Sequence, residues 1–219
     1  MSVSDLPILY SFRRCPYAMR ARLAVASSGQ ACELREVILR DKAEEFLQTS
    51  PSATVPTLKT SEGYVIDESL DIMIWALSRH DPESWLEPQT GALEDMTALI
   101  ESADGDFKSA LDRYKYSTRY EGVDSMAERV KAEVFLQDLD DRLQGSSYLF
   151  GPKITLADMA IAPFVRQFAN VDRDWFDGVH WPHLLRWLGD FLGSDRFNSI
   201  MGKYPRWQRG DTLTRFPAS

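Results

Sequence analysis

Several features that mark common protein classes are scarce in this sequence of 219 residues. It contains two cysteines, Cys15 and Cys32, which exclude a disulfide framework and fit a reducing compartment, so we expect a cytoplasmic protein. No apolar run approaches the about 18 residues of a membrane span, and no basic-then-apolar signal opens the chain. We therefore expect neither export nor an association with membranes.

Positive charge is also in short supply. The 25 Lys and Arg residues face 33 Asp and Glu residues, a net charge of −8, whereas a nucleic-acid-binding protein would show a basic face. The three histidines, His80, His180 and His183, do not have the spacing of metal ligands or of a Cys–His catalytic pair. The sequence therefore predicts no nucleic-acid partner and no metal.

The most informative segment that is present covers residues 11–22. It follows an apolar run that predicts a strand, and it opens a helix with Cys15 at the N-cap and Pro16 at the first helical position. The positive end of a helix favours thiolate over thiol, and a local excess of arginine acts in the same direction. This pattern is typical of a reactive thiol on a thioredoxin-like scaffold. The alternative is a buried, unreactive cysteine beside solvated arginines.

A second thiol close to Cys15 is missing. Ala18 stands where a dithiol oxidoreductase carries its resolving cysteine, and Cys32 lies beyond the helix, roughly 18 Å away at 1.5 Å per residue. We therefore expect no internal disulfide, and an external thiol has to release any mixed disulfide formed on Cys15.

The order of the elements predicts two domains. The first eighty residues alternate, with strands at 7–11, 32–38, 55–58 and 64–66 and helices at 16–28, 41–49 and 67–79. After a linker rich in proline, helices follow at 92–116, 124–144, 155–170 and 181–193, and then an irregular tail. We expect an α/β thioredoxin-like domain at 1–80, a linker at 81–91 and an all-helical bundle domain at 92–219.

Two further segments of the first domain are candidates for ligand binding. In a thioredoxin-like domain Pro56 is cis and exposes the main chain of Val55 to a peptide-like ligand, although a plain turn proline fits the sequence equally well. Glu68 and Ser69 open the last helix of this domain. They either cap that helix or hold the amino and carboxylate groups of a zwitterionic ligand.

These residues together resemble the cytosolic glutathione transferases, and most closely the omega-like branch that carries a cysteine. The resemblance covers essentially the whole chain. It rests on Cys15 within Tyr-Ser-x-Arg-x-Cys-Pro-Tyr-Ala-x-Arg-x-Arg-Leu, on Val55-Pro56-x-Leu58 and on Glu68-Ser69. It implies glutathione as co-substrate, with Cys15 as the residue that bonds or activates it. It also implies these glutathione-binding residues: Lys42, Val55, Pro56, Glu68 and Ser69. Arg40 or Lys59 are alternatives to Lys42.

The helical half supports the same resemblance. Thr155 and Asp158 form a variant of the capping box and resemble the family's folding motif, so we expect structural roles worth roughly 0.5–2 kcal/mol each. Tyr114 and Tyr116 are candidates for lining a second-substrate site, with ordinary helix packing as the alternative. Tyr10 is expected to serve in packing.

Three functions remain open from the sequence. The first is a glutathione-dependent thiol transferase or reductase that acts on a small molecule or a disulfide through a mixed disulfide on Cys15. The second is conjugation of glutathione to electrophiles. The third is a binding module of the same fold without enzymatic activity. The resemblance also implies a homodimer.

Overall fold

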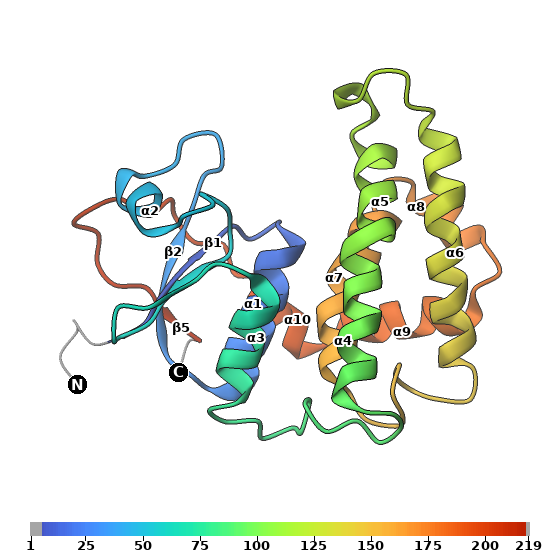
Figure 1. The fold of residues 1–219 in the computed structure, drawn as a ribbon, viewed down its shortest axis with the longest axis horizontal. Helices are drawn as coiled ribbons and strands as arrows, with labels where there is room; N and C mark the ends of the chain where they lie inside the picture. The colour runs from blue at the N-terminus through green and yellow to red at the C-terminus, as the bar shows by residue number, and fades with distance from the viewer. Residues whose placement is uncertain (1–5, 218–219) are drawn as a thin grey trace. The chain divides into compact units, whose positions relative to one another are not determined.

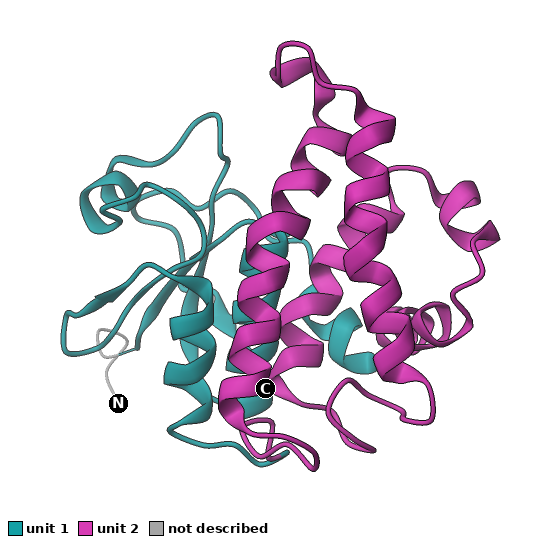
Figure 2. Ribbon diagram, turned by 45° about the vertical axis from the view of Figure 1, so that its right-hand side comes forward, with its two compact units in different colours: residues 1–83, 194–219 teal, residues 84–193 magenta. Residues whose placement is uncertain are grey.

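The computed structural model describes residues 6–217, which belong to two compact units (Figure 2). One unit comprises Met1–Glu83 together with Ser194–Ser219, and the other comprises Ser84–Gly193. The predicted helical domain at 92–219 was therefore too long at its C-terminal end. The chain after Gly193 belongs to the first unit because it packs a helix and a strand there.

The first unit contains a five-stranded sheet in the order β4-β3-β1-β2-β5 (Figure 1). Strands β1 and β2 are parallel, and the remaining pairs are antiparallel. Leu9, Leu34 and Leu58, on three neighbouring strands, form part of its buried core. This mixed sheet is the thioredoxin-like arrangement that the sequence predicts. The strands are β1 (Ile8–Ser11), β2 (Cys32–Glu36), β3 (Thr57–Lys59), β4 (Val65–Ile66) and β5 (Arg215–Phe216).

The helices of the first unit begin and end close to where the sequence places them. Helix α1 (Pro16–Ser28) stops at Gly29, whose positive φ of 68° is the left-handed conformation of a C-terminal glycine. Helix α1 packs along α3 (Ser69–Leu77), and α2 (Glu44–Thr49) is a short separate turn. Helix α10 (Asp195–Ile200) lies in the predicted irregular tail and packs against α1.

The second unit is helical, as predicted. The single helix expected at 92–116 is divided into three parts, because the backbone at Gly105 leaves helical geometry (φ −87°, ψ −109°) within a π-helical turn. Between residues 6 and 217, no helix is long and apolar enough to cross a membrane. The helices of this unit are α4 (Leu93–Ser102), η2 (Ala103–Phe107), α5 (Lys108–Lys115), η3 (Ser117–Arg119), α6 (Ser125–Leu143), α7 (Leu156–Ala169), α8 (Arg173–Gly178) and α9 (Pro182–Gly193).

A buried carboxylate holds the second unit together at the start of α7. Asp158 accepts hydrogen bonds from the backbone N–H (2.9 Å) and the hydroxyl (2.7 Å) of Thr155, the N-cap residue. Its other oxygen accepts from the backbone N–H of Leu149 (3.0 Å) and the indole of Trp187 (2.9 Å). Asp158 therefore joins α7, α9 and the preceding loop, which is more than the capping role seen in the sequence.

Candidate functional site

Cys15 occupies the helix start that the sequence assigns to it. It is the N-cap of α1 with extended backbone angles (φ −78°, ψ 124°), and Pro16 is the first helical residue. The thiol is partly exposed, and its Sγ lies 3.6 Å from the carbonyl oxygen of Val55, to which it donates. The first turn of α1 contains no acidic residue that would oppose a negative charge on the sulfur.

A cluster of buried apolar residues packs against Cys15. Tyr10, Val37, Phe46 and Val55 are buried together, and Cys15 packs against them. The centroid of the Tyr10 ring lies 5.1 Å from that of Phe46, and the Tyr10 hydroxyl accepts a hydrogen bond from Arg35 of β2 at 3.0 Å. Tyr10 therefore serves in packing, as the sequence analysis expects.

Arg22, one of the arginines near Cys15, forms a buried ion pair. Arg22 is fully buried, donates to Ser11 Oγ (2.7 Å) and to the carbonyl of Ile200 (3.1 Å), and pairs with Glu36. Burial lowers the pKa of Arg22, and the charge of Glu36 opposes that shift. Glu36 also accepts from the backbone N–H of Arg13 at 2.7 Å. The charge of Arg22 is thus compensated by Glu36, and the pair fixes the loop before Cys15. Because it is compensated, Arg22 stabilises a Cys15 thiolate less than the local excess of arginine in the sequence suggests.

Arg20 connects α1 to the start of α3. Its Nε–H donates to Ser69 Oγ at 2.9 Å, and both side chains are buried. A hydroxyl that accepts a hydrogen bond still has its own hydrogen to donate. Glu68 is the N-cap of α3, but its side chain makes no capping hydrogen bond. The sequence analysis did not predict this contact, because 49 positions separate Arg20 from Ser69.

Asp67 fastens the Val55-Pro56 loop to the same helix start. Its carboxylate accepts from Ser50 Oγ (2.9 Å), the backbone N–H of Ser52 (3.0 Å) and Thr57 Oγ1 (2.7 Å). The Val55-Pro56 peptide is cis. The Cys15 thiol therefore contacts the Val55-Pro56 loop, and Arg20 of α1 contacts Ser69 at the start of α3. Asp67, which the sequence analysis did not single out, joins that loop to the start of α3.

The titration of Asp67 gives a test of this network. Partial burial acts to raise the pKa of Asp67, but the hydrogen bonds from Thr57, Ser52 and Ser50 outweigh it and hold the pKa below the ordinary value. The resulting stability is present above the unfolded pKa of about 3.9 and is lost as pH falls through the folded value. We expect Asp67→Asn to lose about 1–3 kcal/mol at pH 7.

Urea unfolding at several pH values checks this prediction. The difference between wild type and Asp67→Asn should stay constant from pH 7 to about 4 and shrink below that, because the aspartate of the unfolded chain is protonated first and that of the folded chain at lower pH. A difference that stays constant below that pH as well would mean that the charge of Asp67 does not support the loop.

The remaining candidates lie apart from these contacts. Lys42, a partly exposed residue, precedes α2 in the first unit. Tyr114 and Tyr116 belong to the second unit. Tyr114 is buried, and its ring packs 5.4 Å from that of Phe168. Tyr116 ends α5 with Arg119 above its ring at 4.1 Å. Nothing in these contacts assigns a ligand to the two tyrosines.

The second cysteine has the properties of an inert core residue. Cys32 is 1% exposed, and burial raises the pKa of its thiol to about 12. Neither cysteine forms a disulfide. In residues 6–217 no group of three or more His, Cys, Asp and Glu side chains could hold a metal ion. Thiol chemistry in this part of the chain therefore depends on Cys15.

The fold and the cysteine site define a two-part protein with a thioredoxin-like first unit and a helical second one. Comparison with family models agrees with this class. Residues 9–84 match the model of the glutathione S-transferase N-terminal domain, and residues 127–209 match that of the C-terminal domain. The chain belongs to the cytosolic glutathione S-transferase superfamily and has an omega-like relationship within it.

Individual relatives support the same placement. Glutathione S-transferase omega-1 of Rattus norvegicus is 25% identical over 184 residues, which cover 82% of this chain and 74% of the relative. A glutathione transferase family member from Pseudomonas fluorescens pf-5, solved with two glutathione bound, superposes with a TM-score of 0.79 at 19% identity, covering 92% and 94% of the two chains. Glutathione transferase Omega 3C from Trametes versicolor gives a TM-score of 0.74 at 18% identity, covering 92% and 86%. These proteins share the fold, and the family supports a glutathione-dependent activity for the chain.

Proposed function

We propose that this protein is a glutathione-dependent thiol transferase that works through a mixed disulfide on Cys15. The observation that carries the proposal is the position of the Cys15 sulfur at the N-cap of α1, 3.6 Å from the carbonyl of Val55. A partly exposed thiol at a helix N-terminus is the setting in which cysteine acts as a nucleophile. When the thiol ionises, the first-turn N–H groups of α1 become its donors in place of the bond to Val55.

The parts of glutathione match groups around this sulfur. The backbone of Val55 pairs with the cysteinyl part, and Pro56 holds that backbone in place. The first-turn N–H groups of α3 and the Ser69 hydroxyl bind the γ-glutamyl carboxylate, while Glu68 pairs with its amino group. Arg20 supports this role, since its hydrogen bond to Ser69 Oγ leaves the serine hydrogen for the ligand. Lys42 binds the glycyl carboxylate.

The proposed reaction exchanges one disulfide for another in two steps. The Cys15 thiolate attacks the glutathione sulfur of a mixed disulfide, a bond forms between Cys15 and glutathione, and the substrate leaves as a thiolate that takes up a proton. The thiolate of a second glutathione then attacks the glutathione sulfur of the adduct. Oxidised glutathione leaves and the Cys15 thiolate is restored, so one free glutathione reduces the mixed disulfide, and its sulfur ends in oxidised glutathione with that of the glutathione that the substrate carried.

Conjugation of glutathione to an electrophile is the competing enzymatic function. A cysteine beside bound glutathione tends to form a disulfide with it, whereas conjugation needs a group that only activates the glutathione sulfur. The absence of a neighbouring second thiol in the described residues also suits a route in which glutathione itself resolves the adduct. Thiol transfer is therefore favoured over conjugation.

Rates on two substrates distinguish these functions. We expect rapid reduction of the mixed disulfide of glutathione and 2-mercaptoethanol, and slow conjugation of an aryl halide, both measured at saturating glutathione. Fast conjugation with little disulfide reduction would establish the second function. Retention on immobilised glutathione is a separate check. A chain that neither binds glutathione nor catalyses either reaction would be a non-enzymatic binding module of the same fold.

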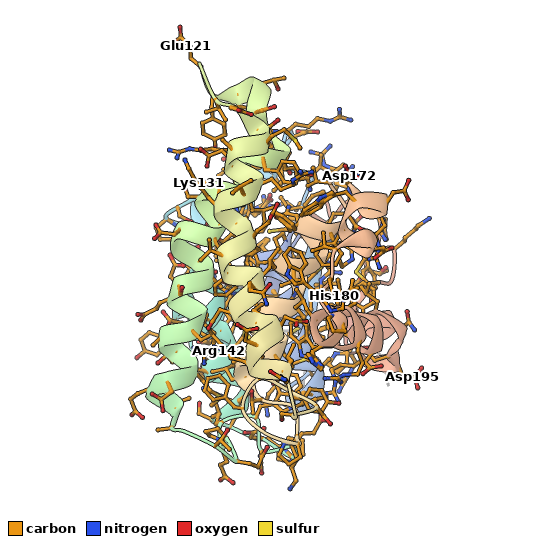
Figure 3. The ribbon with its side chains drawn as sticks, turned by 90° about the vertical axis from the view of Figure 1, so that its right-hand side faces the viewer. Glu121, Lys131, Arg142, Asp172, His180 and Asp195 are labelled. Atoms are coloured by element: carbon orange, nitrogen blue, oxygen red, sulfur yellow. The ribbon has the colours of Figure 1, made fainter. Side chains whose placement is uncertain are left out.

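A homodimer, which the resemblance implies, also fits the surface of the second unit. Met126, Val130 and Val134 follow one another at helical spacing on α6 and are 47%, 58% and 73% exposed. Figure 3 shows α6 from its outer side, with Lys131 and Arg142 labelled along it. Such an apolar stripe is unusual on a monomer. We place this dimer in the cytoplasm, where glutathione is reduced.

Replacing Val134 with glutamate tests the dimer. A charge buried at the contact without a partner should raise the dimer dissociation constant by at least about tenfold, as measured by sedimentation. Asn198→Glu, at an exposed position of α10, adds the same charge in the other unit and should leave the dimer intact. Equal sedimentation of Val134→Glu and wild type would exclude this face.

A further inference from the structure

The short helix α2 depends on its surroundings for order. Among its six residues only Phe46 is buried, and its N-cap residue, Ala43, makes no side-chain capping bond. A helix of one or two turns is not stable alone in water. The segment that includes it, residues 41–49, also carries Lys42. Whatever holds this segment in place therefore bears on glutathione binding.

The end of the chain supplies two ion pairs to that segment. Arg206 pairs with the side chain of Asp41 and donates to its carbonyl oxygen at 3.2 Å. Arg209 pairs with Glu45, in the first turn of α2. In Figure 1 the red C-terminal chain runs beside α2, more than 150 positions away in sequence. These contacts lie within the first unit.

Trp207, between the two arginines in sequence, contacts Tyr10 of the apolar cluster that packs against Cys15. Its ring meets that of Tyr10 edge-on, with the centroids 6.4 Å apart, and Tyr10 in turn packs against Phe46 of α2. The guanidinium carbon of Arg35 lies 4.0 Å from the Trp207 ring centroid, a cation–π contact. Trp207 is therefore linked to α2 through the rings of Tyr10 and Phe46.

Strand pairing anchors this part of the chain to the sheet. The backbone N–H of Trp207 donates to the carbonyl of Glu36 at 3.0 Å, and that of Leu34 donates to Thr214 at 2.8 Å. Beyond them β5 pairs antiparallel with β2, and Phe216 is buried in the pairing. The segment is thus fixed to the sheet at Trp207, between the two arginines, and again after Arg209.

We propose that residues 206–209, here named the C-terminal clamp, hold residues 41–49 in the arrangement that binds glutathione. Arg206, Trp207 and Arg209 are positioning residues in this proposal, which rests on the proposed function. They act on the affinity for glutathione and take no part in the disulfide exchange. Single exposed ion pairs contribute little to stability, so the clamp is expected to act through its members jointly.

Removing both ion pairs tests the clamp. In the double variant Arg206→Ala/Arg209→Ala, we expect hydrogen exchange of residues 41–49 to quicken and the Kd for glutathione to rise about five- to tenfold, as the binding-competent fraction falls. The KM for glutathione should rise in parallel, while kcat at saturating glutathione stays within about twofold. Arg142→Ala/Arg173→Ala removes two exposed ion pairs from the second unit and should change none of these values.

Charge reversal separates positioning from a general loss of stability. Arg209→Glu alone should weaken glutathione binding, and Arg209→Glu/Glu45→Arg should restore it, because the ion pair forms again with opposite polarity. Unchanged exchange and unchanged Kd in Arg206→Ala/Arg209→Ala would overturn the clamp. If wild type does not bind glutathione, the proposed function fails, and exchange of residues 41–49 still decides whether the clamp orders α2.

Discussion

Replacing Cys15 with serine is expected to lower the rate of disulfide reduction by at least about 100-fold, because a serine hydroxyl stays protonated at neutral pH and cannot form a mixed disulfide. Glutathione binding should persist, since the contacts proposed for Val55, Glu68 and Ser69 do not involve the Cys15 sulfur. The measurement is kcat for reduction of the mixed disulfide of glutathione and 2-mercaptoethanol, together with the Kd for glutathione. A variant that binds but does not reduce places the chemistry at Cys15.

The second cysteine provides the control for this experiment. Cys32→Ala removes the buried thiol of β2, whose pKa burial raises to about 12, so it should leave kcat unchanged. A modest loss of stability, on the order of 1 kcal/mol, is expected from the missing sulfur in the core. Substantial reduction by Cys15→Ser, or loss of reduction in Cys32→Ala, would contradict the assignment.

Replacing Asp158 with alanine is expected to cost about 3–5 kcal/mol of unfolding free energy. The substitution leaves four buried donors without their acceptor, namely the N–H groups of Thr155 and Leu149, the Thr155 hydroxyl and the Trp187 indole. This exceeds the roughly 0.5–2 kcal/mol expected for an N-terminal cap alone, because Asp158 also bonds to α9 and to the loop before α7. Urea unfolding followed by tryptophan fluorescence measures it.

A second aspartate separates this joining role from simple capping. Asp124 is the exposed N-cap of α6 and accepts from the N–H groups of Met126 (2.9 Å) and Ala127 (3.3 Å). Asp124→Ala should cost only about 1 kcal/mol, because water can replace its acceptor. Similar losses for the two variants would show that the additional contacts of Asp158 contribute no stability.

The parts of the fold that local sequence determines could be predicted. Cys15 and Pro16 specify where α1 begins, and Gly29, which readily takes a positive φ, specifies where it ends. Strand β5 could not be predicted, because it has two residues and its order comes from pairing with β2 across a long stretch of chain. Helix α10 has six residues, too few for a periodic pattern to indicate a helix.

The residues of the candidate site likewise divide into those predictable from local sequence and those that depend on tertiary contacts. Cys15 and the Val55-Pro56 turn carry local signals that any thioredoxin-like domain needs, and the structure brings them into contact. The contacts of Arg20, Asp67 and Trp207 have no such signal, because they join segments that only the folded chain brings together. A sequence motif therefore locates the reactive thiol, whereas the groups that hold its neighbours in place emerge from tertiary structure.

The most direct test of the account is the mass of the intact protein after incubation with oxidised glutathione. Wild type should gain one glutathione, peptide mapping should place it on Cys15, and reduced glutathione should remove it. Cys15→Ser should gain none. If wild type binds glutathione and yet forms no adduct, Cys15 is not the nucleophile, and conjugation or a binding role would replace thiol transfer.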